Sequence, residues 1–436
     1  MRKRILVVNP PSFAIKPINV SESVFMAPYV TASYLKRAGE DCQIYDFVND
    51  ELTFNGWTDI RIEDVGRCGN FENEHISKRI YYIGRHEKFY IQYLSVYKPT
   101  EVWISCLFTY NWKAAKFVAD LTRQYDPNIK IKIGGVYATL CPDHARQNID
   151  CDEVVVSAPD DPMRLTKVNI NLYRTIPYMY PILTSTGCAF RCKWCAVHII
   201  EGTKRIEADP MAVADQIEQL YYCGVKRIRF MDSDILHNFD KHLKVILDEI
   251  IKRKVKISLT SYGGVNPLFA TQEALELMAQ AGFKSIQIPL ESVSQDILAE
   301  NRHSIRIRDW EFCISQLHRI KNFSISSYVL CGLPGQKIQD IYKAINFVQD
   351  YGVSPQPLFF TPIPGTPYED PEIPLEYANP YLFPYASPEM PVEELEQIVV
   401  NHIGVRGNIV YIPEYIKGNI ITSGKPIPKE EVYARD

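Results

Sequence analysis

Short apolar runs alternate with amphipathic stretches from the first residue to about position 160, which predicts strands and helices in turn. Helical spacing covers 26–38 and 112–125, and Gly39 stands where the first of these helices should end. Strands that alternate with helices of this length indicate right-handed βαβ units, and so a doubly wound, Rossmann-like parallel sheet. The apolar runs predicted as its strands are 4–8, 42–47, 102–107, 129–133 and 152–156.

A polar stretch from about 50 to 100 interrupts this alternation. It is longer than an ordinary connection between a strand and a helix, so we expect helices within it, such as one over 78–96. We interpret it as an insertion in the first domain.

The alternation restarts near Tyr180 and continues to about Pro367. Six strand–helix repeats predict an incomplete parallel α/β barrel, a (β/α)6 barrel of TIM type, with its chemistry at the C-terminal ends of the strands. The predicted strands are 181–185, 226–231, 256–261, 285–290, 324–330 and 356–361, with helices beginning near 210, 240, 271, 309 and 336.

These patterns divide the chain into four predicted parts. The Rossmann-like domain covers 1–160, a linker covers 161–179, and the partial barrel covers 180–367. The remaining residues, 368–436, form a small C-terminal extension rich in aromatic residues and proline, with a predicted helix near 392–401 and a strand at 409–412.

Composition and charge exclude several classes of protein. Of the 436 residues, 46% are hydrophobic and 23% charged, which is ordinary for a soluble protein. The net charge of −4 without a basic block argues against a nucleic-acid partner. No apolar run approaches the about 18 residues of a membrane span, and the run after Arg2-Lys3-Arg4 is too short for a signal peptide. We therefore expect a cytoplasmic protein without a membrane partner.

Three cysteines follow the first predicted barrel strand, in the run 186–195. Cys188, Cys192 and Cys195 have the spacing C-x-x-x-C-x-x-C, with Trp194 directly before the last thiol. Three thiolates can hold only three irons of a [4Fe–4S] cubane, where a closed site uses four. The fourth iron is then open to a ligand that is not protein.

Other interpretations of the three cysteines fit the sequence less well. His198 makes a Cys3His zinc site conceivable, although zinc sites usually show paired C-x2-C spacing. Buried structural cysteines are disfavoured by the neighbouring Arg191 and Lys193. An electron-transfer ferredoxin needs a fourth cysteine, and no other cysteine lies close to the run in the sequence. No cysteine follows Cys331, so a C-terminal auxiliary iron–sulfur domain is also excluded.

The cysteine run resembles the signature of radical S-adenosylmethionine (SAM) enzymes, in which SAM chelates the open iron through its amino and carboxylate groups. The opening ILVVNPPS, the segment IKIGGVYATLCPDHA and the downstream barrel resemble the subfamily with an N-terminal cobalamin (B12)-binding-type domain. The resemblance covers residues 1 to about 365. One departure is Ser157-Ala158-Pro159-Asp160-Asp161, where many relatives have a turn rich in glycine and glutamate.

The resemblance implies a SAM site at the ends of the barrel strands. Trp194 would lie beside the cluster and the adenine, Asp232 or Asp234 would take the methionyl ammonium, and Glu291 with Ser292 would contact the ribose or the amino group. Local alternatives are loop packing for the tryptophan, N-capping for the aspartates and a first-turn helix acid for the glutamate. The turn Gly332-Leu333-Pro334-Gly335 would lie against the adenine, with Gly332 and Pro334 as contacts, or is an ordinary turn.

Cobalamin would lie at the carboxyl ends of the first sheet's strands, where ligands of such sheets bind. Gly134-Gly135 allows a large flat ligand to approach the backbone closely, although a plain tight turn uses the same residues. The sequence contains no G-x-G-x-x-G motif, so it does not support a dinucleotide site in place of cobalamin. The candidate cobalamin-binding residues on these loops are Pro10, Ser105, Thr109, Gly134, Gly135 and Tyr137.

The resemblance implies reductive cleavage of SAM to a 5′-deoxyadenosyl radical that abstracts hydrogen from an unactivated carbon. We expect cobalamin-dependent C-methylation of a small molecule or peptide, with a one-electron reductant such as flavodoxin or ferredoxin as partner. A non-methylating outcome (ring contraction, cyclisation, epimerisation or C–C coupling), with cobalamin as redox partner or absent, is the alternative. An iron–sulfur or zinc scaffold protein is the distant alternative.

Overall fold

The computed structural model describes residues 3–14, 26–48, 60–67, 79–173, 176–261, 264–321, 323–380, 390 and 392–398. These residues divide into two compact units. The first comprises described residues up to 177 together with 371–380, and the second comprises those of 178–370 together with 390–398. In the described part of the chain, no helix has both the length and the apolar character that a membrane span requires.

The first unit is built on a five-stranded parallel sheet in the order β3-β1-β6-β7-β8. This confirms the doubly wound α/β fold that the alternating pattern predicts. Parallel pairing joins every pair of neighbours, and β1 lies between β3 and β6. The strands are β1 (Arg4–Asn9), β3 (Asp41–Asp46), β6 (Glu101–Ser105), β7 (Lys130–Gly134) and β8 (Glu153–Val154).

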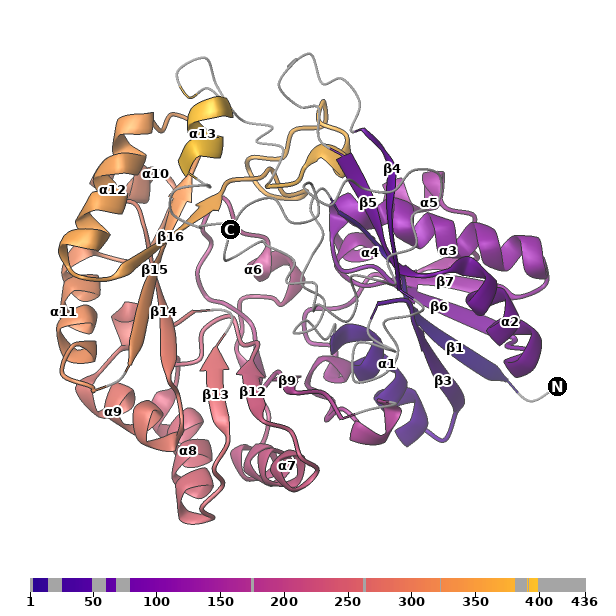
Figure 1. Cartoon of the computed structure of the whole chain (residues 1–436), viewed down its shortest axis with the longest axis horizontal. Helices are drawn as coiled ribbons and strands as arrows, with labels where there is room; N and C mark the ends of the chain where they lie inside the picture. Colours follow the sequence, from indigo (N-terminus) through magenta and orange to yellow (C-terminus); the bar gives the residue numbers. More distant parts are fainter. Residues whose placement is uncertain are drawn as a thin grey trace. The chain divides into compact units, whose positions relative to one another are not determined.

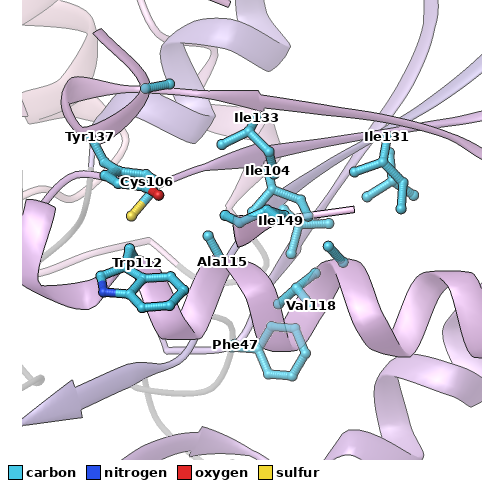
Figure 2. Close-up of a cluster of buried hydrophobic side chains, with 14 of the residues drawn as sticks. Phe47, Ile104, Cys106, Trp112, Ala115, Val118, Ile131, Ile133, Tyr137 and Ile149 are labelled. Carbon is cyan, nitrogen blue, oxygen red and sulfur yellow. The ribbon is translucent and has the colours of Figure 1, made fainter. Parts of the chain in front are cut away.

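The sheet is covered on both faces, which explains why β1 is a continuous apolar run. Ile5 and Val7 pack on one face with Ala32 and Leu35 of α1 (Met26–Arg37). Leu6 and Val8 belong to a larger core on the other face. That core is formed with α2 (Glu87–Tyr97) and α3 (Trp112–Tyr125), and Figure 2 shows part of it, including Ile104, Ala115, Val118 and Ile131.

The insertion contains a small sheet where the sequence predicted a helix over 78–96. Strands β4 (Ile60–Arg67) and β5 (Arg79–Arg85) pair antiparallel, and β2 (Ser12–Ala14) pairs with β5. The run Ile80-Tyr81-Tyr82-Ile83 explains the error, because aromatic and β-branched residues favour a strand over a helix. Only the later part of the predicted helix forms, as α2.

The predicted linker packs on the first unit. The backbone N–H of Asn169 donates to Ser33 Oγ at 2.8 Å, and Val168 is buried. Residues 371–380 of the extension also join this unit, where Trp112 Nε1 donates to Glu376 Oε2 at 3.0 Å. The predicted strand at 409–412 lies outside the described residues.

The described part of the second unit contains six parallel strands that follow one another in chain order. They form two ladders, β9-β12-β13 and β14-β15-β16, joined by the parallel bridge between Leu259 and Phe283. Helices cover the outer side of this curved row (Figure 1), as in a partial TIM barrel. The strands are β9 (Met179–Ile182), β12 (Arg227–Phe230), β13 (Ser258–Ser261), β14 (Ser285–Glu291), β15 (Ser324–Cys331) and β16 (Ser354–Phe359). The helices are α7 (Pro210–Tyr222), α8 (Leu243–Lys252), α9 (Gln272–Ala281), α10 (Gln295–Glu300), α11 (Ile307–Leu317) and α12 (Ile338–Asp350), with α13 (Val392–Ile398) from the extension.

Candidate active site

The three cysteines lie on a loop that a short hairpin closes. Strand β10 (Ser185–Thr186) pairs antiparallel with β11 (Ile206–Glu207), and the loop between them carries the cysteines and α6 (Val197–Ile200). Gly187 has φ 95°, and a Cβ there would lie 2.1 Å from the carbonyl oxygen of Lys204. The glycine before the first cysteine is therefore required by the close approach of the hairpin's two sides.

The cysteine thiols fit an iron–sulfur cluster by their donor chemistry. Burial raises the pKa of Cys192 to about 12 and that of Cys195 to about 11, and it also raises the pKa of Cys188. The thiols thus need a bound metal to become thiolates near neutral pH. In the described ranges, no three His, Cys, Asp or Glu side chains converge on one point as the ligands of a single ion must. A cubane differs because each thiolate binds a separate iron.

A carboxylate and a guanidinium near Cys188 each have one buried polar atom that finds no hydrogen-bond partner among the described residues. These atoms are Asp234 Oδ2 and Arg205 Nη2, and both side chains act electrostatically on Cys188. Burial raises the pKa of Asp234 to about 6. The rest of each group is occupied: Arg205 Nε donates to Glu207 Oε1 at 2.6 Å, and Asp234 Oδ1 accepts from the Leu236 backbone N–H at 3.1 Å. A buried polar atom without a partner is costly, and the ammonium and carboxylate of an amino acid would satisfy the two that remain. Arg205 was not among the predicted site residues, because an isolated arginine on a hairpin belongs to no motif.

Asp232 has a different environment from Asp234. Its Oδ1 accepts from Thr184 Oγ1 at 2.7 Å and from Ser185 Oγ, and its Oδ2 accepts from the Thr184 backbone N–H at 3.3 Å. The carboxylate is fully buried and ties the end of β9 to the end of β12. Both of its oxygens are therefore used by the protein, which leaves Asp234 as the better candidate for a ligand's ammonium.

We predict that Asp232→Ala lowers the free energy of unfolding by about 2–4 kcal/mol, because it leaves buried donors of Thr184 and Ser185 unsatisfied. Urea denaturation of the metal-free protein would measure this. The exposed Asp240 offers a control, and Asp240→Ala should change stability by less than about 0.5 kcal/mol. Equal stabilities of the two variants would contradict the anchoring role.

Glu291 combines backbone strain with a buried carboxylate. It has φ 66°, and the register of β14 against β15 shifts between Pro289 and Glu291. Its Oε2 is buried and has no hydrogen-bond partner within the described ranges, and burial raises the pKa of the side chain to about 7. Helix α10 begins at Gln295 with Ser294 as its N-cap, so Glu291 is not a first-turn acid. A non-glycine residue held in the left-handed backbone conformation at a strand end is typical of functional sites.

Ser292, the other predicted site residue at this strand end, forms a hydrogen bond within its own turn. It is fully buried, and its Oγ accepts from the Ser294 backbone N–H at 3.1 Å. This contact stabilises the turn that leads from Glu291 into α10. The hydroxyl of Ser292 supports the turn in addition to any contact with a ligand.

The side chain of Gln336 holds the glycine turn after β15 by hydrogen bonds. In the sequence, Gln336 was predicted only as the start of a helix. Its Oε1 accepts from the backbone N–H groups of Gly332 (2.8 Å) and Leu333 (3.1 Å), and its Nε2 donates to Leu330 O (3.0 Å). Gly332 and Gly335 have positive φ, and a Cβ at either would meet no atom of the described residues within 4 Å. The turn that contains Pro334 therefore has open space beside its two glycines.

His303 packs against Trp194, which lies on the cysteine loop between Cys192 and Cys195. Trp194 packs against the apolar cluster of Leu330, Leu333 and Phe360, near the ends of β15 and β16. Its ring centroid lies 5.0 Å from that of His303, whose Nδ1 is 3.4 Å from Cys192 Sγ. Burial lowers the pKa of His303 to about 4. His303 was not among the predicted site residues, because it lies far along the chain from the last motif cysteine, on another loop.

The candidate cobalamin residues of the first unit occupy the strand ends but differ in environment. Pro10 is buried after β1, Ser105 ends β6 and Thr109 begins a short 3-10 turn. A Cβ on Gly135 would lie 2.4 Å from Cys106 O, so packing requires this glycine. A Cβ on Gly134 would meet nothing within 4 Å in the part of the chain that the structure describes. Tyr137 is fully buried, and its OH lies 2.8 Å from His144 Nδ1, which places it in the core.

Large apolar side chains are exposed at the same edge of the sheet. Leu107 and Phe108 follow β6, and Val156 follows β8, with exposed fractions of 37%, 39% and 50%. The ring of Phe108 stacks on Tyr110 at 5.0 Å and 8°. Exposed apolar surface of this kind marks binding sites. A large flat ligand would cover it, so these strand ends fit the corrin ring of cobalamin.

Comparisons with known proteins identify a family for the second unit. Residues 182–348 match the sequence profile of the Radical SAM superfamily. Threonylcarbamoyladenosine tRNA methylthiotransferase MtaB of Thermotoga maritima is 24% identical over 346 residues, 71% of this chain and 76% of the relative. Bacteriochlorophyllide d C-12(1)-methyltransferase of Chlorobaculum tepidum is 27% identical over 198 residues, 44% of this chain and 42% of the relative.

Solved structures resemble most of the chain. Radical S-adenosylmethionine methyltransferase TsrM of Kitasatospora setae, solved with cobalamin and a [4Fe-4S] cluster, has a TM-score of 0.61 and 15% identity, covering 84% of this chain and 77% of TsrM. OxsB, a cobalamin-dependent S-adenosylmethionine radical enzyme, has a TM-score of 0.53 and 14% identity, covering 80% of this chain and 52% of OxsB. At these identities the likeness shows the fold.

Proposed function

We propose that this chain, which belongs to the radical SAM superfamily through its domain at 182–348, is a cobalamin-dependent C-methyltransferase acting on a small molecule or peptide. The radical SAM domain implies a [4Fe–4S] cluster and SAM. The observation that carries the proposal is that three cysteines lie near Asp234 and Glu291, at the ends of barrel strands, and near Arg205 of the hairpin, each of which has one buried polar atom without a hydrogen-bond partner among the described residues. The cysteines offer metal ligands, Asp234 and Arg205 offer partners for the ammonium and carboxylate of an amino acid, and Glu291 offers an acceptor for hydroxyl groups.

Each residue has a defined task in this proposal. Cys188, Cys192 and Cys195 hold three irons, and a bound cluster would supply the electron that cleaves SAM to a 5′-deoxyadenosyl radical. Asp234 binds the methionyl ammonium, and Arg205 binds the carboxylate.

The remaining groups orient the nucleoside part of SAM. Glu291 accepts from the ribose hydroxyls, and the turn held by Gln336 leaves room for the adenine beside Gly332. Fixed positioning of this kind places the 5′ carbon against the substrate's C–H bond.

We predict that Asp234→Asn weakens SAM binding by about 10- to 100-fold, because a charged hydrogen bond contributes about 1.5–3 kcal/mol. Calorimetric titration of SAM into the anaerobic, cluster-loaded protein measures this. Arg205→Gln should cost a similar factor. The exposed Asp240→Asn serves as the matched control. Wild-type affinity in both site variants would remove these residues from the SAM site.

Cobalamin enters the proposal through the first unit. The exposed apolar side chains Leu107, Phe108 and Val156 and the open space at Gly134 support a flat ligand there. The fold shared with TsrM and OxsB, whose solved structures hold cobalamin, supports the same ligand. A bound cobalamin would supply the methyl group that the substrate radical accepts.

The test is an anaerobic absorption spectrum followed by turnover with SAM and reductant. We expect bands of both the cluster and a corrinoid, and formation of 5′-deoxyadenosine together with S-adenosylhomocysteine. A protein that contains zinc and no iron would exclude the enzyme. Formation of 5′-deoxyadenosine alone would exclude methylation but keep the radical reaction. The reductant, a flavodoxin or ferredoxin, is part of the proposal, as is a cytoplasmic location.

A non-methylating radical reaction is the second candidate. The run 157–161 favours it, because it replaces the glycine- and glutamate-rich turn of many cobalamin-binding relatives. In this case the first unit keeps its fold and uses cobalamin as a redox partner, or binds none. The spectrum and the product analysis described above distinguish the two candidates.

A further inference from the structure

His303 is fixed beside the cysteine loop by two kinds of contact. The carbonyl oxygen of Asn301 accepts from the Lys193 backbone N–H at 3.1 Å, which joins the segment before His303 to the residue after Cys192. The imidazole ring packs against Trp194 at a centroid distance of 5.0 Å and an interplanar angle of 49°. Backbone and ring contacts together bring Nδ1 to 3.4 Å from Cys192 Sγ.

We propose that His303 is a positioning residue that donates an Nδ1–H···S hydrogen bond to the Cys192 thiolate and thereby raises the reduction potential of the cluster. The proposal rests on the proposed function, since it requires the cluster. A metal-bound thiolate can only accept a hydrogen bond, so the ring nitrogen that faces it, Nδ1, must carry a proton. Hydrogen bonds to the sulfurs are among the factors that set cluster potentials. The donor stabilises the reduced cluster, which carries one more negative charge.

The rest of the ring makes His303 suitable for a clean test. In the described part of the chain, its Nε2 is buried and has no hydrogen-bond partner. Replacing the ring by a phenyl ring therefore removes the contact with Cys192 and breaks no other hydrogen bond of the ring. Trp194 rests on Leu330, Leu333 and Phe360, so the packing surface for the new ring remains.

The experiment compares three substitutions at this position. His303→Phe keeps the shape and removes the donor. His303→Asn places an amide nitrogen near the position of Nδ1, whereas His303→Gln places it near that of Nε2. Each protein is reconstituted with iron and sulfide, checked for about four irons per chain, and titrated anaerobically with dithionite while the reduced cluster is followed by electron paramagnetic resonance.

We expect the Phe and Gln variants to shift the midpoint potential to more negative values, and the Asn variant to stay close to wild type. The expected size is about tenfold in the reduction equilibrium, or about 59 mV for a one-electron couple. His318→Phe is the matched control. His318 follows the C-terminal end of α11, far along the chain from the cysteines, and its Nε2 lies 2.8 Å from Tyr351 O. Its potential should be unchanged.

Two outcomes separate this inference from the proposed function. If all the proteins load a cluster and the Phe, Gln and Asn variants share the wild-type potential, His303 does not act on the cluster and the inference is overturned. If the wild-type protein itself loads no iron, the proposed function fails first. Should the Phe variant load poorly, the comparison of Asn with Gln still decides the question, because both side chains are polar amides.

Discussion

Replacing Cys188, Cys192 or Cys195 singly by alanine is expected to reduce bound iron to background and to abolish 5′-deoxyadenosine formation. With one thiolate missing, one more iron of the cubane lacks a protein ligand, and a cluster held at only two corners is readily lost. Iron and sulfide analysis after anaerobic reconstitution would measure the loss, and product analysis with SAM and dithionite would measure the activity.

The matched control for the cysteine variants is Cys223→Ala. Cys223 is exposed at the end of α7, in the same unit but not on the cysteine loop. It should keep wild-type iron and activity. Full iron content in any of the three loop variants would contradict the assignment of that cysteine as a ligand.

The second large effect is expected at Glu291. Glu291→Gln should weaken SAM binding by about 10- to 100-fold, because a carboxylate accepts hydroxyl hydrogen bonds more strongly than an amide. The same change should stabilise the metal-free protein above neutral pH, because it removes a buried charge. Loss of affinity combined with gain of stability is the signature of a strained binding residue.

The pH dependence of this stabilisation follows from the pKa of Glu291, which burial raises from 4.5 to about 7. The folded state binds the proton more tightly, so the contribution of Glu291 to stability is complete below about pH 4.5 and is lost as the pH rises through about 7. The stability difference between Glu291→Gln and wild type should therefore grow between pH 5 and 8, and it should reach about 3 kcal/mol.

Thermal unfolding of the metal-free proteins across this pH range would measure the effect. Glu300→Gln, at an exposed position on α10, is the control and should follow the wild-type curve. A constant difference between Glu291→Gln and wild type would show that the carboxylate does not titrate in this range.

Both parallel sheets could be predicted from local patterns, because each strand is a short apolar run that can be recognised without knowledge of its neighbours. The run at 4–8 is almost entirely apolar, and β1 proves to be buried on both sides. Thr271 caps α9 and Gly282 ends it, as their types imply. The insertion was less predictable, because β5 is stabilised by pairing with β2, which lies far earlier in the chain.

By itself, the sequence determined the three-cysteine motif and the order of strands and helices, because both depend on residues that are close along the chain. Only the tertiary structure separated Asp234 from Asp232, since hydrogen bonds from Thr184 and Ser185 occupy one carboxylate and not the other. It also brought Arg205 and His303 to the cysteines. Contacts between distant segments arise when a barrel folds and its strand ends meet, and no local pattern records them.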